Sequence, residues 1–389
     1  MRFLYVAAVF DNECIKNKFG GKPVFAYAAS KYNTLIFEGI VKNGVEAKVL
    51  SVLPINRSNY KKVFFKGYTQ KKEKLSIRFL SQINLPIIKN IVNIMGGFFG
   101  TLFAPKDTVV IYDVLVVSAS MGVTAAAKLR GFKKVGIVTD LPKFMPISQS
   151  SFMLKISEKV VDNADAYIFL TVQMNEEVNK KGKPYIVLEG HVNNEMKDKE
   201  HKEFLCEEKH IIYAGGINKI YGIEMLCKAF LDIALPGEIL HIYGNGDYAD
   251  DLKALANERS NMVYHGNRPN DEIVEAELGA TLLVNPRPTD GEYTKFSFPS
   301  KTLEYMVSGT PVLSSRLPGI PDEYKNYIFY FDENTQESLG KKMREVLNMS
   351  PEELQNKGAS ARCFALEEKN NVVQSAKIID FCKLIQKDK

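Results

Sequence analysis

Short apolar runs that alternate with helix-patterned segments constrain the fold of this chain more than any other feature. The runs have the length of single strands, whereas the segments between them repeat apolar residues at helical spacing, as Leu35 and Ile36 do after Tyr32. Such alternation predicts parallel sheets covered by helices. In the first half we expect strands at 2–9, 46–53, 108–112, 134–139, 166–171 and 184–188, and helices at 27–43, 118–129 and 152–163.

The second half repeats this architecture after residues 193–208, a charged stretch that predicts an interdomain connection. Ser350 and Glu353 form a capping box that opens a helix toward residue 367. We expect the other helices at 221–233, 248–259, 270–278, 301–308, 336–347 and 372–385, and strands at 210–214, 238–243, 261–265, 280–284, 311–314 and 328–331. The predicted fold is therefore α/β, with two Rossmann-like domains at 1–192 and 209–368 whose parallel sheets face an interdomain cleft.

Composition disfavours several classes of function. A chain of 389 residues exceeds one ordinary core, and its 45% hydrophobic and 25% charged residues are globular values. A net charge of +5 is too small to favour a nucleic-acid partner. The five cysteines and five histidines show no metal-ligand spacing, so we expect reduced thiols, no metal site and no Ser–His–Asp set. The start, MRFLYVAAVFDNE, predicts a strand rather than a signal peptide.

The segment FPSKTLEYM, which begins at Phe298, is the strongest functional signal. It predicts a short helix that ends at Gly309 and leads into a buried strand. The backbone N–H groups and the dipole at a helix start attract anions, and here Ser300 adds a hydroxyl and Lys301 a cation. Glu304 lies one turn further along the same face as Ser300. This spacing suits a nucleotide with its diphosphate at the helix start and its ribose on the glutamate. A capped surface helix with a solvated glutamate fits the same residues.

Glycine-containing turns follow three of the expected strands, at the carboxyl ends where parallel sheets bind ligands. These turns lie at residues 20–21, 215–219 and 244–247. Glycine lets backbone N–H groups approach a phosphate closely, so the shared placement indicates a phosphate site. Strand-to-helix turns also need glycine for purely structural reasons, and that interpretation stays open for each turn.

Two further segments carry charge at strand ends. The polar loop 285–297 connects a buried strand to the Ser300 helix, and its Arg287 and Lys295 are able to neutralise a diphosphate. An exposed loop with incidental charge is the alternative. In the first half, Asp140 ends a buried strand, where it would bind a sugar hydroxyl or help to deprotonate an acceptor. A helix N-cap or a turn would use the same aspartate.

No stretch reaches the ~20 apolar residues that span a bilayer. Residues 85–104 come nearest, with one lysine and three glycines. A basic segment precedes them, with Lys61, Lys62, Lys66, Lys71, Lys72, Lys74 and Arg78. Positive charge beside an apolar helix can hold a protein on an anionic membrane, so contact with a membrane surface is one interpretation of these residues. A core helix beside a solvated basic loop is the alternative.

Taken together, these residues resemble the family-4 glycosyltransferases of the GT-B fold, especially bacterial enzymes that build capsular or cell-surface polysaccharides. The resemblance is clearest over 209–347, in YAGGINKIYGIEML, HIYGNGD, VYHGNRPNDEI and FSFPSKTLEYMVSGTPVLSS. The first half resembles the family in architecture, in the turn at 20–21 and in ADAYIFLT. In such enzymes the N-terminal domain binds the acceptor and the C-terminal domain binds a nucleotide sugar. The last helix, here within 369–389, usually crosses back to the first domain.

The resemblance implies a retaining glycosyltransferase that moves a sugar from a nucleoside diphosphate, with a UDP-sugar favoured, to a lipid-linked glycan acceptor in surface polysaccharide synthesis. It implies no cofactor and no required metal, and a cytoplasmic location at the inner face of the cell membrane. Glu304 matches the family's ribose-binding glutamate. The implied donor-binding residues are Gly20, Gly21, Gly215, Gly216, Asn218, Lys219, Gly244, Arg287, Lys295, Ser297, Phe298, Ser300, Lys301 and Glu304, and the candidate catalytic residues are Asp140 and Glu292.

Three positions depart from the family pattern. Phe296 stands eight residues before the matched glutamate, where a first glutamate often contacts the donor sugar. Gly216 takes the place of a phosphate-binding arginine, and Tyr221 takes that of a lysine. Candidates to compensate are Lys219, Arg287, Lys295 and Lys301 for the phosphates and Glu292 for the sugar. The departures leave two other functions open, namely a non-catalytic GT-B partner of an active transferase and a sugar-nucleotide epimerase.

Overall fold

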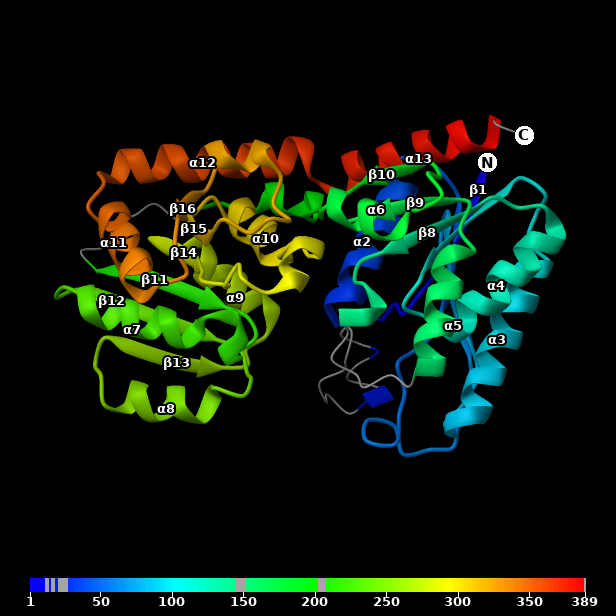
Figure 1. Ribbon diagram of the computed structural model, residues 1–389, viewed down its shortest axis with the longest axis horizontal. Helices are drawn as coiled ribbons and strands as arrows, with labels where there is room; N and C mark the ends of the chain where they lie inside the picture. The colour runs from blue at the N-terminus through cyan, green and yellow to red at the C-terminus, as the bar shows by residue number, and fades with distance from the viewer. Residues whose placement is uncertain (11–13, 15–17, 20–26, 145–150, 202–207, 388–389) are drawn as a thin grey trace. The chain divides into compact units, whose positions relative to one another are not determined.

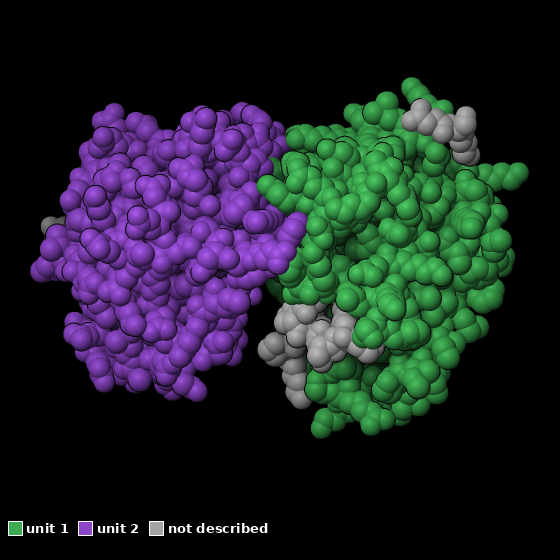
Figure 2. All heavy atoms as spheres, viewed as in Figure 1, with its two compact units in different colours: residues 1–189, 371–389 green, residues 190–370 purple. Residues whose placement is uncertain are grey.

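The computed structural model describes residues 1–10, 14, 18–19, 27–144, 151–201 and 208–387. The chain divides into unit 1, which comprises residues 1–189 and 371–389, and unit 2, which comprises residues 190–370 (Figure 2). Each unit has its own mainly parallel sheet with helices around it (Figure 1). The alternating α/β architecture predicted from the apolar runs is therefore confirmed.

The main sheet of unit 1 has the strand order β10-β9-β8-β7-β1-β2-β5-β4 within the described residues. All neighbouring strands pair in parallel except β4, which runs antiparallel to β5 at the sheet edge. The sequence predicts only a basic loop where this edge hairpin and a small β3–β6 pair occur. The strands are β1 Arg2–Ala7, β2 Ala47–Ser51, β3 Phe64–Phe65, β4 Tyr68–Lys72, β5 Leu75–Phe79, β6 Gln82–Ile83, β7 Thr108–Asp113, β8 Lys134–Val138, β9 Ala166–Phe169 and β10 Tyr185–Val187.

Helices cover both faces of the unit 1 sheet. One face packs on α2 and on α13, so that Phe37 and Ile378 share a core with Tyr5 and Ile111. The other face meets α3, because Gly100 lies against Leu50. The helices of this unit are α2 Tyr27–Lys42, α3 Pro86–Leu102, α4 Val117–Arg130, η1 Pro142–Phe144, α5 Ser151–Asp162, α6 Val172–Val178 and α13 Asn371–Lys387.

The last helix, α13, belongs to unit 1 although the preceding helix belongs to unit 2. Its N-terminal residue Asn371 donates a hydrogen bond from Nδ2 to the carbonyl oxygen of Leu35 at 3.2 Å. Ser375 donates to the carbonyl oxygen of Ile36 at 2.8 Å. Gly39 allows the close approach, since a Cβ there would lie 2.1 Å from the carbonyl oxygen of Asn371. The chain thus returns to the first unit at its C-terminal end.

The sheet of unit 2 has the order β13-β12-β11-β14-β15-β16 within the described residues, and all its pairs are parallel. One face packs on α7, α8 and α11, and the other packs on α10 and α12. Because both faces are covered, the strands are mostly apolar. The strands are β11 Lys209–Ala214, β12 Glu238–Tyr243, β13 Met262–Gly266, β14 Leu282–Asn285, β15 Val312–Ser315 and β16 Phe329–Phe331.

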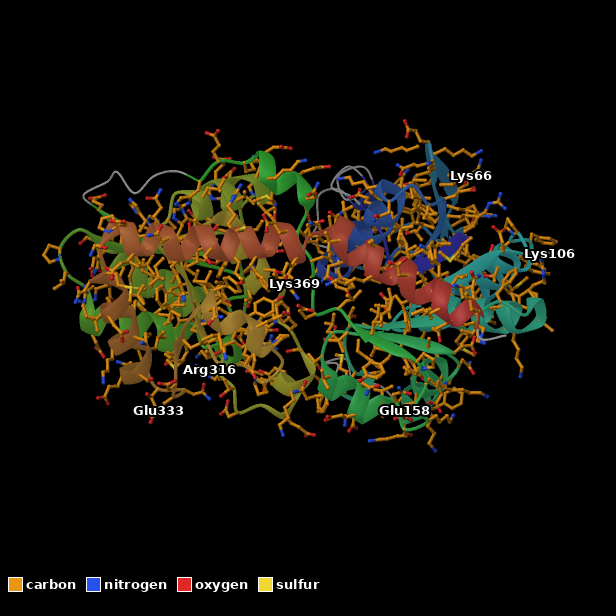
Figure 3. All side chains as sticks on the ribbon, turned by 90° about the horizontal axis from the view of Figure 1, so that it is seen from above. Lys66, Lys106, Glu158, Arg316, Glu333 and Lys369 are labelled. Carbon is orange, nitrogen blue, oxygen red and sulfur yellow. The ribbon has the colours of Figure 1, made fainter. Side chains whose placement is uncertain are left out.

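The helices of unit 2 follow the expected spans closely. The predicted capping box at the start of α12 is present, with Ser350 and Glu353 bonded to each other's backbone N–H groups. At the C-terminal end of α12, Lys369 pairs with Glu323 at 2.6 Å (Figure 3). The helices are η2 Asn194–Asp198, η3 Lys219–Tyr221, α7 Ile223–Ile233, α8 Ala249–Asn257, α9 Asn270–Leu278, η4 Glu292–Phe296, α10 Ser300–Ser308, η5 Asp322–Asn326, α11 Gln336–Leu347 and α12 Pro351–Glu368.

Helix α3 differs from an ordinary amphipathic helix, because its small and polar residues are buried and several of its large apolar residues are exposed. Its buried positions are Asn93, Gly97, Gly100 and Thr101. Glycines bring it against α4, since a Cβ at Gly97 would lie 2.4 Å from the carbonyl oxygen of Ala119. The large apolar side chains of the helix therefore point to solvent. They are Ile87, Ile88, Ile91, Met95 and Phe99, with Phe103 just after the helix.

Candidate functional site

The N-terminus of α10 lies where the sequence predicts an anion site. Pro299 precedes the first helical residue with extended backbone, and no side chain caps the free N–H groups. Lys301 and Glu304 lie in the first turns, each about one-third exposed, with Lys301 Nζ 3.9 Å from Glu304 Oε2. This distance is at the outer limit of an ion pair, so the two side chains are near each other without a short hydrogen bond. Leu303 and Met306 anchor the helix, because both side chains are buried in the core.

The glycine turn after β11 lies beside Lys301. A Cβ at Gly215 would be 2.8 Å from Lys301 Cε, so the end of the lysine side chain lies directly against this turn. The next turn, after β12, is in close contact with the β11 turn. Gly244 has φ +129°, and a Cβ there would be 1.8 Å from the carbonyl oxygen of Gly215. The turns at 215 and 244 and the start of α10 thus meet at the carboxyl ends of neighbouring strands, as predicted.

The residues that follow Gly216 join the β11 and β12 turns by hydrogen bonds. Asn218 Oδ1 accepts from the backbone N–H of Asp247 at 3.1 Å, and Asp247 Oδ1 accepts from that of Lys219 at 2.9 Å. The ammonium group of Lys219 pairs with Asp251 at 3.1 Å, and this bond raises the lysine pKa. Asn218 and Lys219 therefore stabilise the turn, and the charge of Lys219 is already matched by a carboxylate.

Arg287 lies at the carboxyl end of β14 between two aromatic rings. Its guanidinium carbon is 5.5 Å from the ring centroid of Tyr221 and 5.1 Å from that of Tyr293. Tyr221 in turn lies against Gly216, where a Cβ would be 3.0 Å from its ring. Lys301 and the Tyr221–Arg287 pair therefore flank the two glycines of the β11 turn. Cations on both sides of a glycine turn suit an anionic ligand.

Other predicted residues occupy the loop between β14 and α10. Lys295 and Glu292 are exposed on η4, and Phe296 is half-buried at its end. Phe298 is a core residue whose ring lies 5.5 Å from that of Tyr324. The Oγ of Ser297 is buried and has no hydrogen-bond partner among the described residues. The same holds for Asn285 Nδ2, Arg287 Nε and Thr302 Oγ1. These polar atoms mark the loop as a place where a ligand or water would complete the hydrogen bonding.

In unit 1, Asp140 is exposed just after β8 and before η1. Gly20 and Gly21 lie outside the described residues. The sequence does not single out Asp113, which ends β7 and is buried. Its carboxylate accepts hydrogen bonds from Asn33 Nδ2 at 3.1 Å and from the Leu115 backbone at 2.9 Å. Burial raises the pKa of Asp113 to about 6 despite these bonds.

Three histidines form a row across the edge of the unit 2 sheet. His210 Nδ1 lies 3.0 Å from His241 Nε2, and His241 Nδ1 lies 3.0 Å from His265 Nε2. The ring of His265 stacks on Tyr243, which precedes the Gly244 turn, with centroids 4.2 Å apart. Sequence spacing cannot reveal this row because each histidine comes from a different strand. Neither this row nor any other group of three or more His, Cys, Asp or Glu side chains in the described part of the chain is arranged so that it could hold a metal ion.

The histidine row predicts a pH-dependent stability. Burial, together with the smaller effect of the neighbouring His210 and His265, lowers the pKa of His241 to about 4. Because the folded pKa lies below the unfolded value of about 6.5, the contribution is complete above pH 6.5 and is lost as pH falls toward 4. We expect His241→Phe to flatten the fall in unfolding free energy between pH 7 and pH 4 by about 2 kcal/mol, a figure that allows for partial exposure of the ring. Urea unfolding at several pH values measures this, and a slope equal to that of the control His191→Asn contradicts it.

A protein-family model matches most of unit 2. Residues 194–362 match the family model described as glycosyl transferases group 1. Over 116 residues the chain is 30% identical to the sulfoquinovosyl transferase SQD2 of Arabidopsis thaliana. That match covers 30% of this chain and 21% of the plant protein, so it spans about a fifth of the relative's length.

Solved structures match nearly the whole chain. Sucrose-phosphate synthase from Thermosynechococcus elongatus has a TM-score of 0.71 at 14% identity, with 100% of both chains covered. An E. coli trehalose-6-phosphate structure bound with UDP-2-fluoro glucose gives 0.69 at 9% identity, covering 98% of this chain and 99% of the other. The fold is GT-B. The lipopolysaccharide outer core galactosyltransferase WaaB, in its apo form, has a TM-score of 0.64 at 14% identity, covering 99% of this chain and 100% of the other. The predicted fold class is confirmed, and residues 194–362 are similar to the glycosyl transferases of group 1.

Proposed function

We propose that this chain is a retaining glycosyltransferase that transfers a sugar from a nucleoside diphosphate sugar, with a UDP-sugar favoured, to a lipid-linked glycan acceptor. The proposed role is the synthesis of a bacterial surface polysaccharide at the inner face of the cell membrane. The observation that carries the proposal is the meeting of Lys301 and the start of α10 with the Gly215–Gly216 turn. The match of residues 194–362 to a glycosyltransferase family supports it.

The proposed chemistry is electrostatic. Negative charge develops on the diphosphate as the bond to the sugar breaks, and preorganised cations and N–H groups stabilise that charge. Lys301, Arg287 and the free N–H groups of α10 would supply this stabilisation, and Glu304 would bind the ribose hydroxyls. We infer that no metal is required for this step. Asp140 or Glu292 would assist at the sugar or the acceptor.

The first test of this function is donor turnover by the purified chain. We expect slow hydrolysis of one UDP-, GDP- or dTDP-sugar without acceptor, and retention of anomeric configuration in the released sugar, both visible by NMR. Binding of a nucleoside diphosphate with no hydrolysis or transfer, even with membrane extracts as acceptor source, would favour the non-catalytic partner instead. That alternative is motivated by Phe296, Gly216 and Tyr221 at the departing positions. Formation of an isomeric nucleotide sugar would favour the epimerase.

Membrane contact is the second part of the proposal, and helix α3 carries it. Ile87, Ile91, Met95 and Phe99 are four residues apart and exposed, so they form one apolar stripe along the helix. A stripe of this kind needs an apolar partner. None of the helices in the described residues is long and apolar enough to cross a membrane. We infer that α3 lies along the bilayer surface instead.

A basic loop lies at the start of the same helix. Asn84, two residues before α3, donates from its backbone N–H to Val63 at 2.7 Å and from Nδ2 to Tyr60 at 2.6 Å. The loop therefore holds Lys61 and Lys62 near the start of the apolar stripe, and Lys66, labelled in Figure 3, follows further along the chain. Each lysine near an anionic bilayer contributes about 1 kcal/mol. This charge favours an anionic membrane over a second copy of the chain, whose lysines would repel these.

A further inference from the structure

Arg287 carries a positive charge that no described residue of unit 2 neutralises. Its guanidinium forms no ion pair or hydrogen bond with any of the described residues, although the side chain is half-buried. Most buried charges are paired, because a cation that loses water without gaining a partner is destabilising. Tyr221 and Tyr293 offset part of this cost through their ring faces, yet ring faces leave the N–H donors unused. A half-buried guanidinium without an anionic partner is suited to bind an anionic ligand.

Neighbouring residues hold the backbone that carries Arg287 in place. Ser315 donates a hydrogen bond from its hydroxyl to the carbonyl oxygen of Arg287, which ties the start of the loop to β15. Gly222 has φ +77°, and a Cβ there would be 2.2 Å from the carbonyl oxygen of Pro286. The turn that carries Tyr221 is thereby pressed against the segment that carries the arginine. The fold therefore sets the backbone position of Arg287 before any ligand binds.

The rings also set which ligand the arginine can take. Tyr221 and Tyr293 lie within cation–π distance of the guanidinium carbon, and ring faces do not satisfy its N–H donors. A planar guanidinium presents parallel N–H donors, which match two oxygens of a phosphate group. Tyr221 touches Gly216, and Lys301 lies against Gly215, so both cations border the same turn. A terminal phosphate at that turn would therefore lie near the positive charges of both Arg287 and Lys301.

We propose that Tyr221, Arg287 and Tyr293 form a guanidinium cage that binds the terminal phosphate of the nucleoside diphosphate. Arg287 is the contact residue, and the two tyrosines are positioning residues that act through it. In the family pattern this turn carries an arginine and a lysine, whereas here Gly216 and Tyr221 stand at those positions. Arg287, which comes from the loop after β14, would supply the positive charge that the turn lacks. This inference rests on the proposed function, because it concerns the donor site of the same unit.

The test compares UDP with UMP, which lacks the terminal phosphate, by isothermal titration calorimetry on the full chain. We expect Arg287→Ala to weaken UDP binding about 10-fold or more and to leave UMP binding within about 2-fold. Arg287→Lys keeps the charge but lacks the planar fork, so it should recover only part of the lost affinity. Tyr293→Phe keeps the ring and should bind UDP normally, whereas Tyr293→Ala should lose several-fold. Thermal melting confirms that each variant is folded.

Equal losses for UDP and UMP in Arg287→Ala would overturn the cage, and so would unchanged UDP binding in Arg287→Ala or in Tyr293→Ala. Should Arg287→Ala not fold, the pair Tyr293→Phe and Tyr293→Ala gives the same decision. These results differ from a failure of the proposed function. If the natural chain binds none of UDP, GDP and dTDP, the donor site itself is wrong and the cage falls with it. If the natural chain binds UDP and the variants do too, only the cage is wrong.

Discussion

Replacing Lys301 by alanine is expected to lower kcat/KM for the nucleotide-sugar donor about 100-fold. The lysine is in the first turn of α10 and lies against the Gly215 turn, so its charge lies where the departing diphosphate would gather negative charge. An interaction that strengthens as the leaving group separates acts on the transition state, and its loss lowers kcat. Steady-state kinetics of donor hydrolysis or transfer measure the effect. The fold should be unaffected, because one-third of the lysine side chain is exposed and its ion pair with Glu304 is long.

The matched control is Lys228→Ala in the same unit. Lys228 pairs with Glu224 one turn earlier on α7, at 2.7 Å, and takes no part in the glycine turns. It removes the same charge from unit 2 without touching the α10 start. Near-natural kcat/KM for Lys301→Ala, or an equal loss in Lys228→Ala, would contradict the assignment of the donor site.

The double change Ile91→Glu and Phe103→Glu is expected to abolish binding to anionic vesicles, with a loss of about 100-fold or more. Ile91 and Phe103 are 52% and 78% exposed, so the fold has little to lose from their replacement. In a bilayer, each new carboxylate would be expensive to bury and would be repelled by anionic headgroups, while the apolar area of the natural side chain is lost. Co-sedimentation with vesicles of phosphatidylcholine and phosphatidylserine gives the bound fraction at each lipid concentration.

Leu384→Glu is the matched control, because Leu384 is an equally exposed apolar residue of unit 1, at 62%, on α13 rather than α3. It should bind vesicles as the natural chain does. Vesicles of phosphatidylcholine alone should bind the natural chain weakly, since the lysines near α3 then have no anionic partner. Vesicle binding that the α3 change leaves intact would show that this stripe has another partner.

The sequence predicts the fold well because both kinds of element have strong local patterns. The helix over 301–308 begins one residue earlier in the structure, and the helices over 270–278 and 336–347 agree with α9 and α11. The apolar runs are buried on both sides, which makes them easy to recognise as parallel strands. The edge hairpin β4–β5 is missed because its outer strand, YTQKK, is polar and looks like a basic loop.

The parts of the site that depend on distant residues are harder to predict. The motif of α10 and the glycine turns are local signals, and the structure brings Lys301 to Gly215 as the strand order requires. The histidine row is invisible in sequence because His210, His241 and His265 meet only when β11, β12 and β13 pair. The same applies to Arg287 and Tyr221, which come from turns after different strands.

Helix α3 shows a different limit of sequence reasoning. Its composition is apolar, which fits either a core helix or a surface helix in contact with lipid. The decision comes from the glycines, because Gly97 and Gly122 let α3 and α4 approach so closely that the large side chains have no space between them. Apolar content can be read from the residues, but the face that a helix buries depends on the packing of its neighbour.

Hydrogen–deuterium exchange in the presence and absence of a nucleoside diphosphate tests the central claim most directly. The claim is that the glycine turn after β11 and the start of α10 together hold the diphosphate. With saturating UDP, or with GDP or dTDP if one of these binds better, we expect slower exchange in peptides that cover residues 213–219 and 298–304. Peptides that cover residues 341–347 of α11 should be unchanged, because Arg344 bonds Glu238 at the amino end of β12, away from the glycine turns at the carboxyl ends of the strands. Nucleotide binding that leaves both of these segments unprotected would contradict the claim.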